Sequence, residues 1–250
     1  MENRTYIVAN WKMHGNSAMA DDLVEAVNKQ ATELPANAEV VLCPPATLLG
    51  EVSKIITGFN VRTGGQDCHE QPDGAFTGDI SASMLRDAGC AYVIVGHSER
   101  RHRHNETNDM VRRKALRAIS SNLTPIICVG ETESERSSGQ AEAVVERQIW
   151  ESIPEEAKEG EFLLAYEPVW AIGSGQSATV ADIRSMHHYI TNVVSKKLGS
   201  DQAKVPVLYG GSVKGANAME IMSLDDVSGV LVGGASLKAE EFCKIMAVAK

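Results

Sequence analysis

Short apolar segments recur along the whole chain, separated by longer stretches whose apolar residues lie three or four positions apart. The short segments are apolar at successive positions, a pattern typical of parallel strands buried on both faces. There are eight: TYIVAN (5–10), AEVVLC (38–43), FNVRTG (59–64), AYVIVG (91–96), PIICVG (125–130), EFLLAY (161–166), VPVLYG (205–210) and GVLVGG (229–234).

Two of the intervening stretches show helical spacing clearly. The apolar face of the first carries Leu23, Val24, Val27, Ala31 and Leu34, and that of the second carries Ile183, Met186, Ile190, Val193 and Val194. Thr179 precedes the second stretch and Asp182 follows three residues later, which predicts an N-cap at the start of this helix.

The alternation of strand and helix predicts an α/β fold, a single (β/α)8 barrel domain of eight parallel strands over residues 1–250. A doubly wound open sheet is the alternative. It predicts a Gly-x-Gly-x-x-Gly turn after the first strand, whereas WKMHG follows that strand here. The barrel is therefore favoured.

The composition limits the binding partners and the cellular compartment that we expect for this protein. The chain has 33 acidic and 24 basic side chains, a net charge of −9, which disfavours nucleic acid or an anionic membrane as a partner. No apolar run approaches the roughly 18 residues of a membrane span, and the first residues are too polar for a secretory signal. We expect a cytoplasmic protein whose five cysteines are reduced thiols.

Polar side chains follow the predicted strands, and the carboxyl ends of barrel strands build the active site. Glu167 follows the sixth segment, where partial desolvation can raise the pKa of a carboxylate toward a working pH. His97 follows the fourth segment just before a predicted helix, whose dipole favours a neutral imidazole. Together they suit proton abstraction beside a carbonyl. A salt-bridge role for Glu167 and a structural role for His97 are the alternatives.

The residues after Glu167 have the composition of a hinged lid. Pro168 fixes the backbone, VWAI supplies an apolar cover, and Gly173 and Gly175 give freedom at the far end. An ordinary surface loop is the alternative, although it would expose three apolar side chains.

A lysine and two glycine turns are also expected at the carboxyl ends of the predicted strands. Lys12 follows the first strand, and Glu99 is expected to hold it when the site is empty; a solvated lysine is the alternative. Gly-Gly turns follow the seventh and eighth strands, in YGGSVKG and VGGASLK. With a short helix beginning at Ala235 or Ser236, they predict a phosphate cradle.

Other polar segments point to no further chemistry. The arginines and histidines of residues 100–106 are expected in a solvated turn before a helix; metal or phosphate binding is the alternative. Cys128 has no evident activating partner, so we expect it to be packed in the interior. We predict no metal site and no cofactor.

These motifs, read together, resemble the triosephosphate isomerase family along the whole chain. The resemblance is carried by ANWKMHG, GAFTGDIS, VIVGHSERR, CVGETESER, AYEPVWAIGSG, YGGSVK and LVGGASL. It implies cofactor-independent interconversion of dihydroxyacetone phosphate and D-glyceraldehyde 3-phosphate in glycolysis and gluconeogenesis. A glutamate base beside a neutral histidine is the documented arrangement in this enzyme.

The resemblance also implies roles for individual residues. Glu167 would move the proton between C1 and C2, and His97 would polarise the carbonyl and shuttle hydroxyl protons through an enediol(ate). Lys12 and Asn10 would stabilise the negative charge. The phosphate would lie on the backbone N–H groups of Gly173, Ser212, Gly233 and Gly234.

Members of the family are usually homodimers, which implies contacts through the loops around His14 and Thr77. His14 stands where asparagine is usual, and Asp79 where glutamate is usual. The segment GSGQSA differs from the common end of the lid, which carries threonine and lysine. The differences at His14 and Asp79 lie in the loops expected to form the dimer, so they put the strength of the dimer in question. A histidine at position 14 also leads to the hypothesis that the dimer affinity depends on pH.

Two other readings compete. An epimerase or aldolase barrel needs metal ligands or a Schiff-base lysine at a strand end, whereas the sixth strand ends in Glu167. A binding-only protein of this fold would be expected to lack Glu167, His97 or Lys12, and all three are present.

Overall fold

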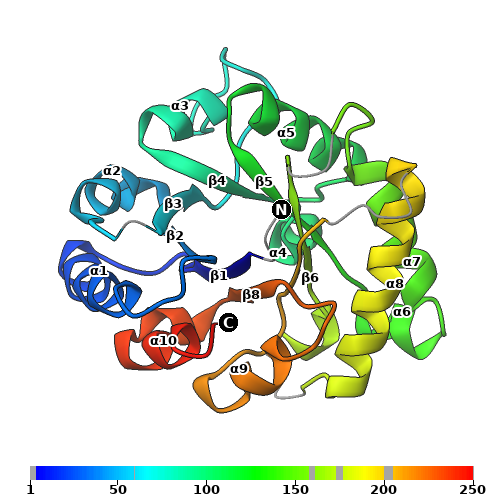
Figure 1. The fold of residues 1–250 in the computed structure, drawn as a ribbon. Coiled ribbons are helices and arrows are strands. Elements are labelled where there is room, and N and C mark those ends of the chain that lie inside the picture. The colour runs from blue at the N-terminus through cyan, green and yellow to red at the C-terminus, as the bar shows by residue number, and fades with distance from the viewer. Residues whose placement is uncertain (1–3, 59, 158–160, 173–176, 200–204, 250) are drawn as a thin grey trace.

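The eight predicted strands close into one parallel barrel (Figure 1). The computed structural model describes residues 4–58, 60–157, 161–172, 177–199 and 205–249. The strands are β1 (Thr5–Asn10), β2 (Ala38–Cys43), β3 (Val61–Gly65), β4 (Cys90–Val95), β5 (Thr124–Val129), β6 (Leu163–Tyr166), β7 (Val207–Tyr209) and β8 (Gly229–Val232). Each strand pairs in parallel with the next, and β8 pairs with β1, so the predicted (β/α)8 barrel is confirmed.

The helices lie mostly around the outside of the barrel, as Figure 1 shows. They are α1 (Ser17–Ala31), α2 (Ala46–Ile55), α3 (Ala82–Asp87), α4 (Ser98–Arg103), α5 (Asn108–Ser120), α6 (Glu133–Ser137), α7 (Ala141–Ser152), α8 (Val180–Leu198), α9 (Gly215–Met222) and α10 (Ala239–Met246), with 3-10 turns η1 (Val169–Ala171) and η2 (Gly234–Leu237). No helix of the described residues is long and apolar enough to cross a bilayer.

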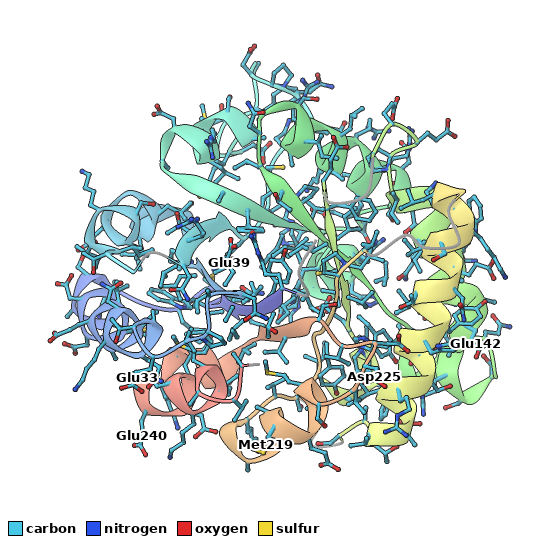
Figure 2. The ribbon with its side chains drawn as sticks, in the orientation of Figure 1. Glu33, Glu39, Glu142, Met219, Asp225 and Glu240 are labelled. Atoms are coloured by element: carbon cyan, nitrogen blue, oxygen red, sulfur yellow. The ribbon has the colours of Figure 1, made fainter. Side chains whose placement is uncertain are left out.

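The strands are apolar at successive positions because both of their faces are buried. Val8 belongs to the cluster inside the barrel and its neighbour Ile7 to the cluster under the helices, and both are fully buried. Each such side chain contributes roughly 1.5–3 kcal/mol to folding. Charged residues such as Glu142 on α7 and Glu240 on α10 lie at the periphery (Figure 2).

Capping residues set the ends of the helices. Thr179 and Asp182 form the predicted capping box at the start of α8. The helical spacing extended α1 to Leu34, and this was wrong: α1 ends at Ala31. The Thr32 hydroxyl donates to the Lys29 carbonyl at 2.8 Å, which satisfies the end of the helix and lets the chain turn.

Candidate active site

A cavity of about 540 Å³ opens at the carboxyl ends of the strands. It brings together residues that the sequence places far apart but at the same rim: Asn10, Lys12, His97, Glu167, Ser212, Gly233 and Gly234. Glu99 contacts Lys12 at the edge of this group. Gly173, the remaining candidate, lies outside the described residues, as does Gly175 at the far end of the lid.

The strand ends place Glu167 and His97 face to face. His97 Nε2 lies 2.9 Å from Glu167 Oε1, and the backbone N–H of Ser98 donates to Glu167 Oε2 at 2.8 Å. His97 caps α4, and its Nδ1 accepts the Glu99 N–H at 3.2 Å. In the neutral ring that bond leaves the proton on Nε2, directed at Glu167.

The two groups shift each other's pKa. Burial raises the pKa of Glu167, but the charge and hydrogen bond of His97, together with the Ser98 N–H, lower it overall. Burial lowers the pKa of His97, but the facing carboxylate raises it overall. The upward shift expected for Glu167 is therefore absent in this arrangement, because its partners stabilise the carboxylate more than burial penalises it.

Lys12 is held in an unusual conformation above the end of β1. Its φ is +53°, in the left-handed region that costs a non-glycine residue about 1–2 kcal/mol. Its backbone N–H donates to Asn10 Oδ1 at 3.0 Å, and its carbonyl accepts from Gln66 at 2.8 Å. Its ammonium group lies 2.6 Å from Glu99, so the expected Lys12–Glu99 pair is confirmed.

The glycine turns after β7 and β8 also line the cavity. The short helix expected at Ala235 or Ser236 is a 3-10 turn that begins at Gly234. Gly210 has a second role: a Cβ there would lie 2.9 Å from Glu167 Cγ and 3.2 Å from the Tyr166 carbonyl oxygen. Only glycine lets this turn approach the base so closely.

The start of the lid is anchored by Glu131 and Arg136, for which the sequence analysis predicted no role. Glu131 is fully buried and accepts hydrogen bonds from Trp170 Nε1 at 2.8 Å and from the Tyr166 hydroxyl at 3.1 Å. The Arg136 guanidinium stacks 4.3 Å over the Trp170 ring and pairs with Asp182 at 2.7 Å. Glu131 could have been noticed only by its position after a buried strand.

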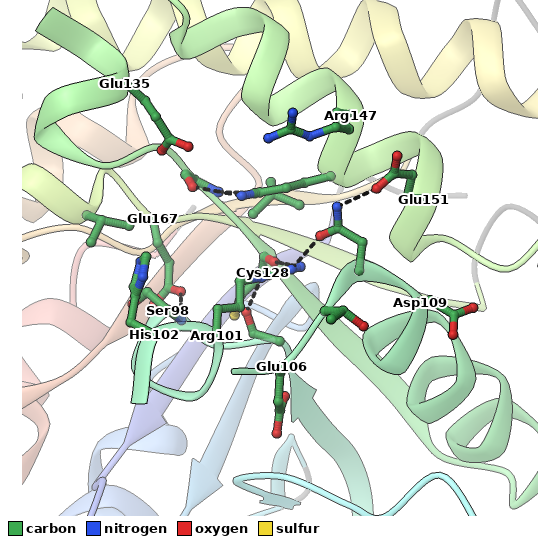
Figure 3. A pocket seen from close by; sticks show the side chains of 17 residues that line it. Ser98, Arg101, His102, Glu106, Asp109, Cys128, Glu135, Arg147, Glu151 and Glu167 are labelled. Carbon is green, nitrogen blue, oxygen red and sulfur yellow. Dashed lines mark hydrogen bonds between the residues drawn. The ribbon is translucent and has the colours of Figure 1, made fainter. Parts of the chain in front are cut away.

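A second pocket lies behind the base and is lined by Glu167, Arg101 and Cys128 (Figure 3). The solvated turn expected over residues 100–106 is correct only in part: residues 102–105 are exposed, but Ser98–Arg103 form α4 and Glu106 is buried. Arg101 donates to the carbonyl oxygens of Gly96 at 2.8 Å and of Cys128 at 3.0 Å, tying the ends of β4 and β5 together. Cys128 is fully buried, as expected, and burial raises the pKa of its thiol.

The fold and the site are those of a (β/α)8-barrel enzyme, with a carboxylate–imidazole pair beside a lysine in a cavity lined by glycine turns. Comparison with known proteins makes this specific: the family model described as triosephosphate isomerase matches residues 5–249. The chain belongs to the triosephosphate isomerase family, and it is an isomerase.

Individual relatives agree over nearly the full length. The chain is 44% identical to the triosephosphate isomerase of Granulibacter bethesdensis, covering 97% of this chain and 98% of the relative. It is 48% identical to that of Afipia carboxidovorans, covering 97% and 96%. The crystal structure of the Bartonella henselae triosephosphate isomerase superposes with a TM-score of 0.90 at 42% identity, covering 98% of each chain.

Proposed function

We propose that Glu167, His97, Lys12 and Asn10 carry out the reaction of this family at the described cavity. That reaction interconverts dihydroxyacetone phosphate and D-glyceraldehyde 3-phosphate without a cofactor, in glycolysis and gluconeogenesis, for which we propose a cytoplasmic location. The pairing of Glu167 with His97 at 2.9 Å, beside Lys12 in one cavity, carries the proposal.

Each group has a defined task in this scheme. The Glu167 carboxylate takes a proton from one carbon of the substrate and returns it to the neighbouring carbon. His97 Nε2–H donates a hydrogen bond to the carbonyl oxygen of the substrate, where negative charge develops. The substrate oxygen then takes the place of Glu167 as the acceptor of this hydrogen bond. Lys12, held by Glu99 before binding, and Asn10 stabilise the same charge in the enediolate.

The phosphate group is assigned to the glycine-lined wall. The backbone N–H groups of Ser212, Gly233 and Gly234 are its proposed donors, together with that of Gly173 outside the described residues. Holding the phosphate in place under a closed lid keeps it from being eliminated from the enediolate.

We further propose a homodimer formed through the loops around His14 and Thr77. Met13, beside His14, is 93% exposed, and Phe76, beside Thr77, is 42% exposed. The proposal is supported by an exposed large apolar side chain in each of the two loops that it names.

The test is the conversion of glyceraldehyde 3-phosphate by purified, chelator-treated protein and by its Glu167→Asp variant. The substitution withdraws the carboxylate by about one methylene, and a misplacement of about 1 Å costs roughly 10²-fold in rate. Fast turnover in the parent that falls by this factor supports the proposal. No turnover in the parent, with phosphate still bound, would indicate a binding protein instead.

A further inference from the structure

Two lysines line the phosphate end of the cavity and have no described acidic partner. Lys214 comes two residues after Ser212, at the start of α9, and Lys238 directly follows η2. Both are exposed and both line the cavity that holds Ser212 and Gly234. Within the described part of the chain, neither ammonium group forms an ion pair with a carboxylate.

Most of the other charges that line this cavity have charged or titratable partners. Lys12 is paired with Glu99 at 2.6 Å, and Glu167 faces His97 at 2.9 Å. Glu241 accepts the Gly215 N–H at 2.7 Å at the start of α9, but it keeps its negative charge. Lys214 and Lys238 together carry two positive charges against this one, so the charge that is left at this end of the cavity is positive.

Local positive charge matters here because the whole chain repels the substrate. The net charge of −9 opposes the approach of a phosphate dianion. Clefts lined by charge of one sign concentrate field lines and raise association rates by roughly 10- to 1,000-fold. Two free ammonium groups at one end of the cavity would also orient the ligand, phosphate toward the glycine turns and carbonyl toward Glu167.

We propose that Lys214 and Lys238 form a capture pair, which draws the phosphate dianion into the cavity and directs it to the backbone donors. The proposal rests on the proposed function. The pair acts before the chemical step and touches no reacting atom. Its loss therefore lowers the rate of substrate association and kcat/KM, and leaves kcat at its parent value.

The experiment compares the double variant Lys214→Gln/Lys238→Gln with a control, Lys29→Gln/Lys54→Gln. The control lysines lie on α1 and α2 and do not line the cavity, and both variants change the net charge equally. We expect the capture variant to lose roughly 3- to 10-fold in kcat/KM at low salt and the control to lose less than about twofold. The loss should shrink at about 1 M salt, where the screening length is only about 3 Å.

Two further measurements separate capture from other roles. Lys214→Arg/Lys238→Arg keeps the charge and should restore kcat/KM. Turnover of glyceraldehyde, which has no phosphate, should be equal in the parent and in the capture variant. Equal loss with both substrates, a loss confined to kcat, or equality with the control would overturn the proposal.

The proposed function can fail independently. If the parent turns over no triose phosphate, that function fails, and titration calorimetry with glycerol 3-phosphate then tests the pair with the same variants and salt series. A salt-sensitive loss of affinity specific to the capture variant supports the pair, and unchanged affinity overturns it.

Discussion

His97 Nε2 and Glu167 Oε1 lie 2.9 Å apart, so the proposed base and the group proposed to polarise the carbonyl contact each other directly. This pairing satisfies two buried polar groups, either of which would be costly alone. In the proposed mechanism the substrate therefore has to take over the N–H of His97. The donor that the mechanism assigns to the substrate carbonyl is thus the one that holds Glu167 in place.

His97→Gln tests how far this pairing controls the base. Glutamine keeps an N–H donor but cannot carry the positive charge of an imidazolium, which lowers the pKa of Glu167, while the burial that raises that pKa remains. We expect the acid limb of the kcat/KM profile to move to higher pH and kcat to fall by roughly 10²- to 10³-fold. An acid limb at the parental position would show that His97 does not set the pKa of Glu167.

Gly210→Ala tests the close approach of the β7 turn to the base. The new Cβ would lie 2.9 Å from Glu167 Cγ and must displace it, so we expect kcat to fall by roughly 10- to 100-fold. Gly50→Ala is the matched control, because a Cβ at Gly50 on α2 meets no atom within 4 Å. Its kcat should equal that of the parent, and a parental kcat in Gly210→Ala would contradict the steric argument.

These residues also show what the sequence can predict. The strands were predictable because their apolar runs are continuous, and Glu167, His97 and Lys12 because each follows a run at the rim of the barrel. The bonds of Arg101 to Gly96 and Cys128 were not, since an arginine in a charged segment looks solvated until the fold brings two strand ends to it.

The direction of the pKa shift of Glu167 was not predictable for a related reason. Position at a strand end correctly indicated burial, which alone raises the pKa. The opposing effect depends on His97 and Ser98, some seventy residues earlier in the chain, lying within hydrogen-bond distance. Sequence spacing predicts that such groups share a rim, but not which atoms meet.

Met13→Glu tests the proposed dimer. A carboxylate at this 93% exposed position would be buried against the partner, so we expect sedimentation to show monomers. Met219→Glu on α9, where the parent side chain is 63% exposed, should leave the dimer intact. A dimer in both variants would place the interface elsewhere.

The pH dependence of the dimer is a separate test, on the parent protein. If a histidine such as His14 lies in the interface, we expect the dimer affinity to differ between about pH 8 and about pH 5.5. Equal dissociation constants at these two values would rule out a role for His14.

His187 predicts how stability responds to acid. It is fully buried on α8 between the rings of Tyr166 and Tyr209, and its Nδ1 lies 3.0 Å from the Asp226 carbonyl oxygen. Burial lowers the pKa of His187 to about 4, from about 6.5 in the unfolded chain. Between these values the unfolded chain binds the additional proton, so the free energy of unfolding falls as the pH is lowered through this range.

The pKa difference of His187 contributes on the order of 3 kcal/mol to the free energy of unfolding. This contribution is present above about pH 6.5 and is lost by about pH 4. We expect His187→Phe, which keeps an aromatic ring but cannot be protonated, to be less stable near neutral pH, because the Asp226 carbonyl loses a donor. Its free energy of unfolding should nevertheless vary less between about pH 4 and 6.5, as denaturant titrations across that range would measure. Parallel pH curves for parent and variant would mean that other groups cause the acid sensitivity, since removing a titrating group must remove its share of the slope.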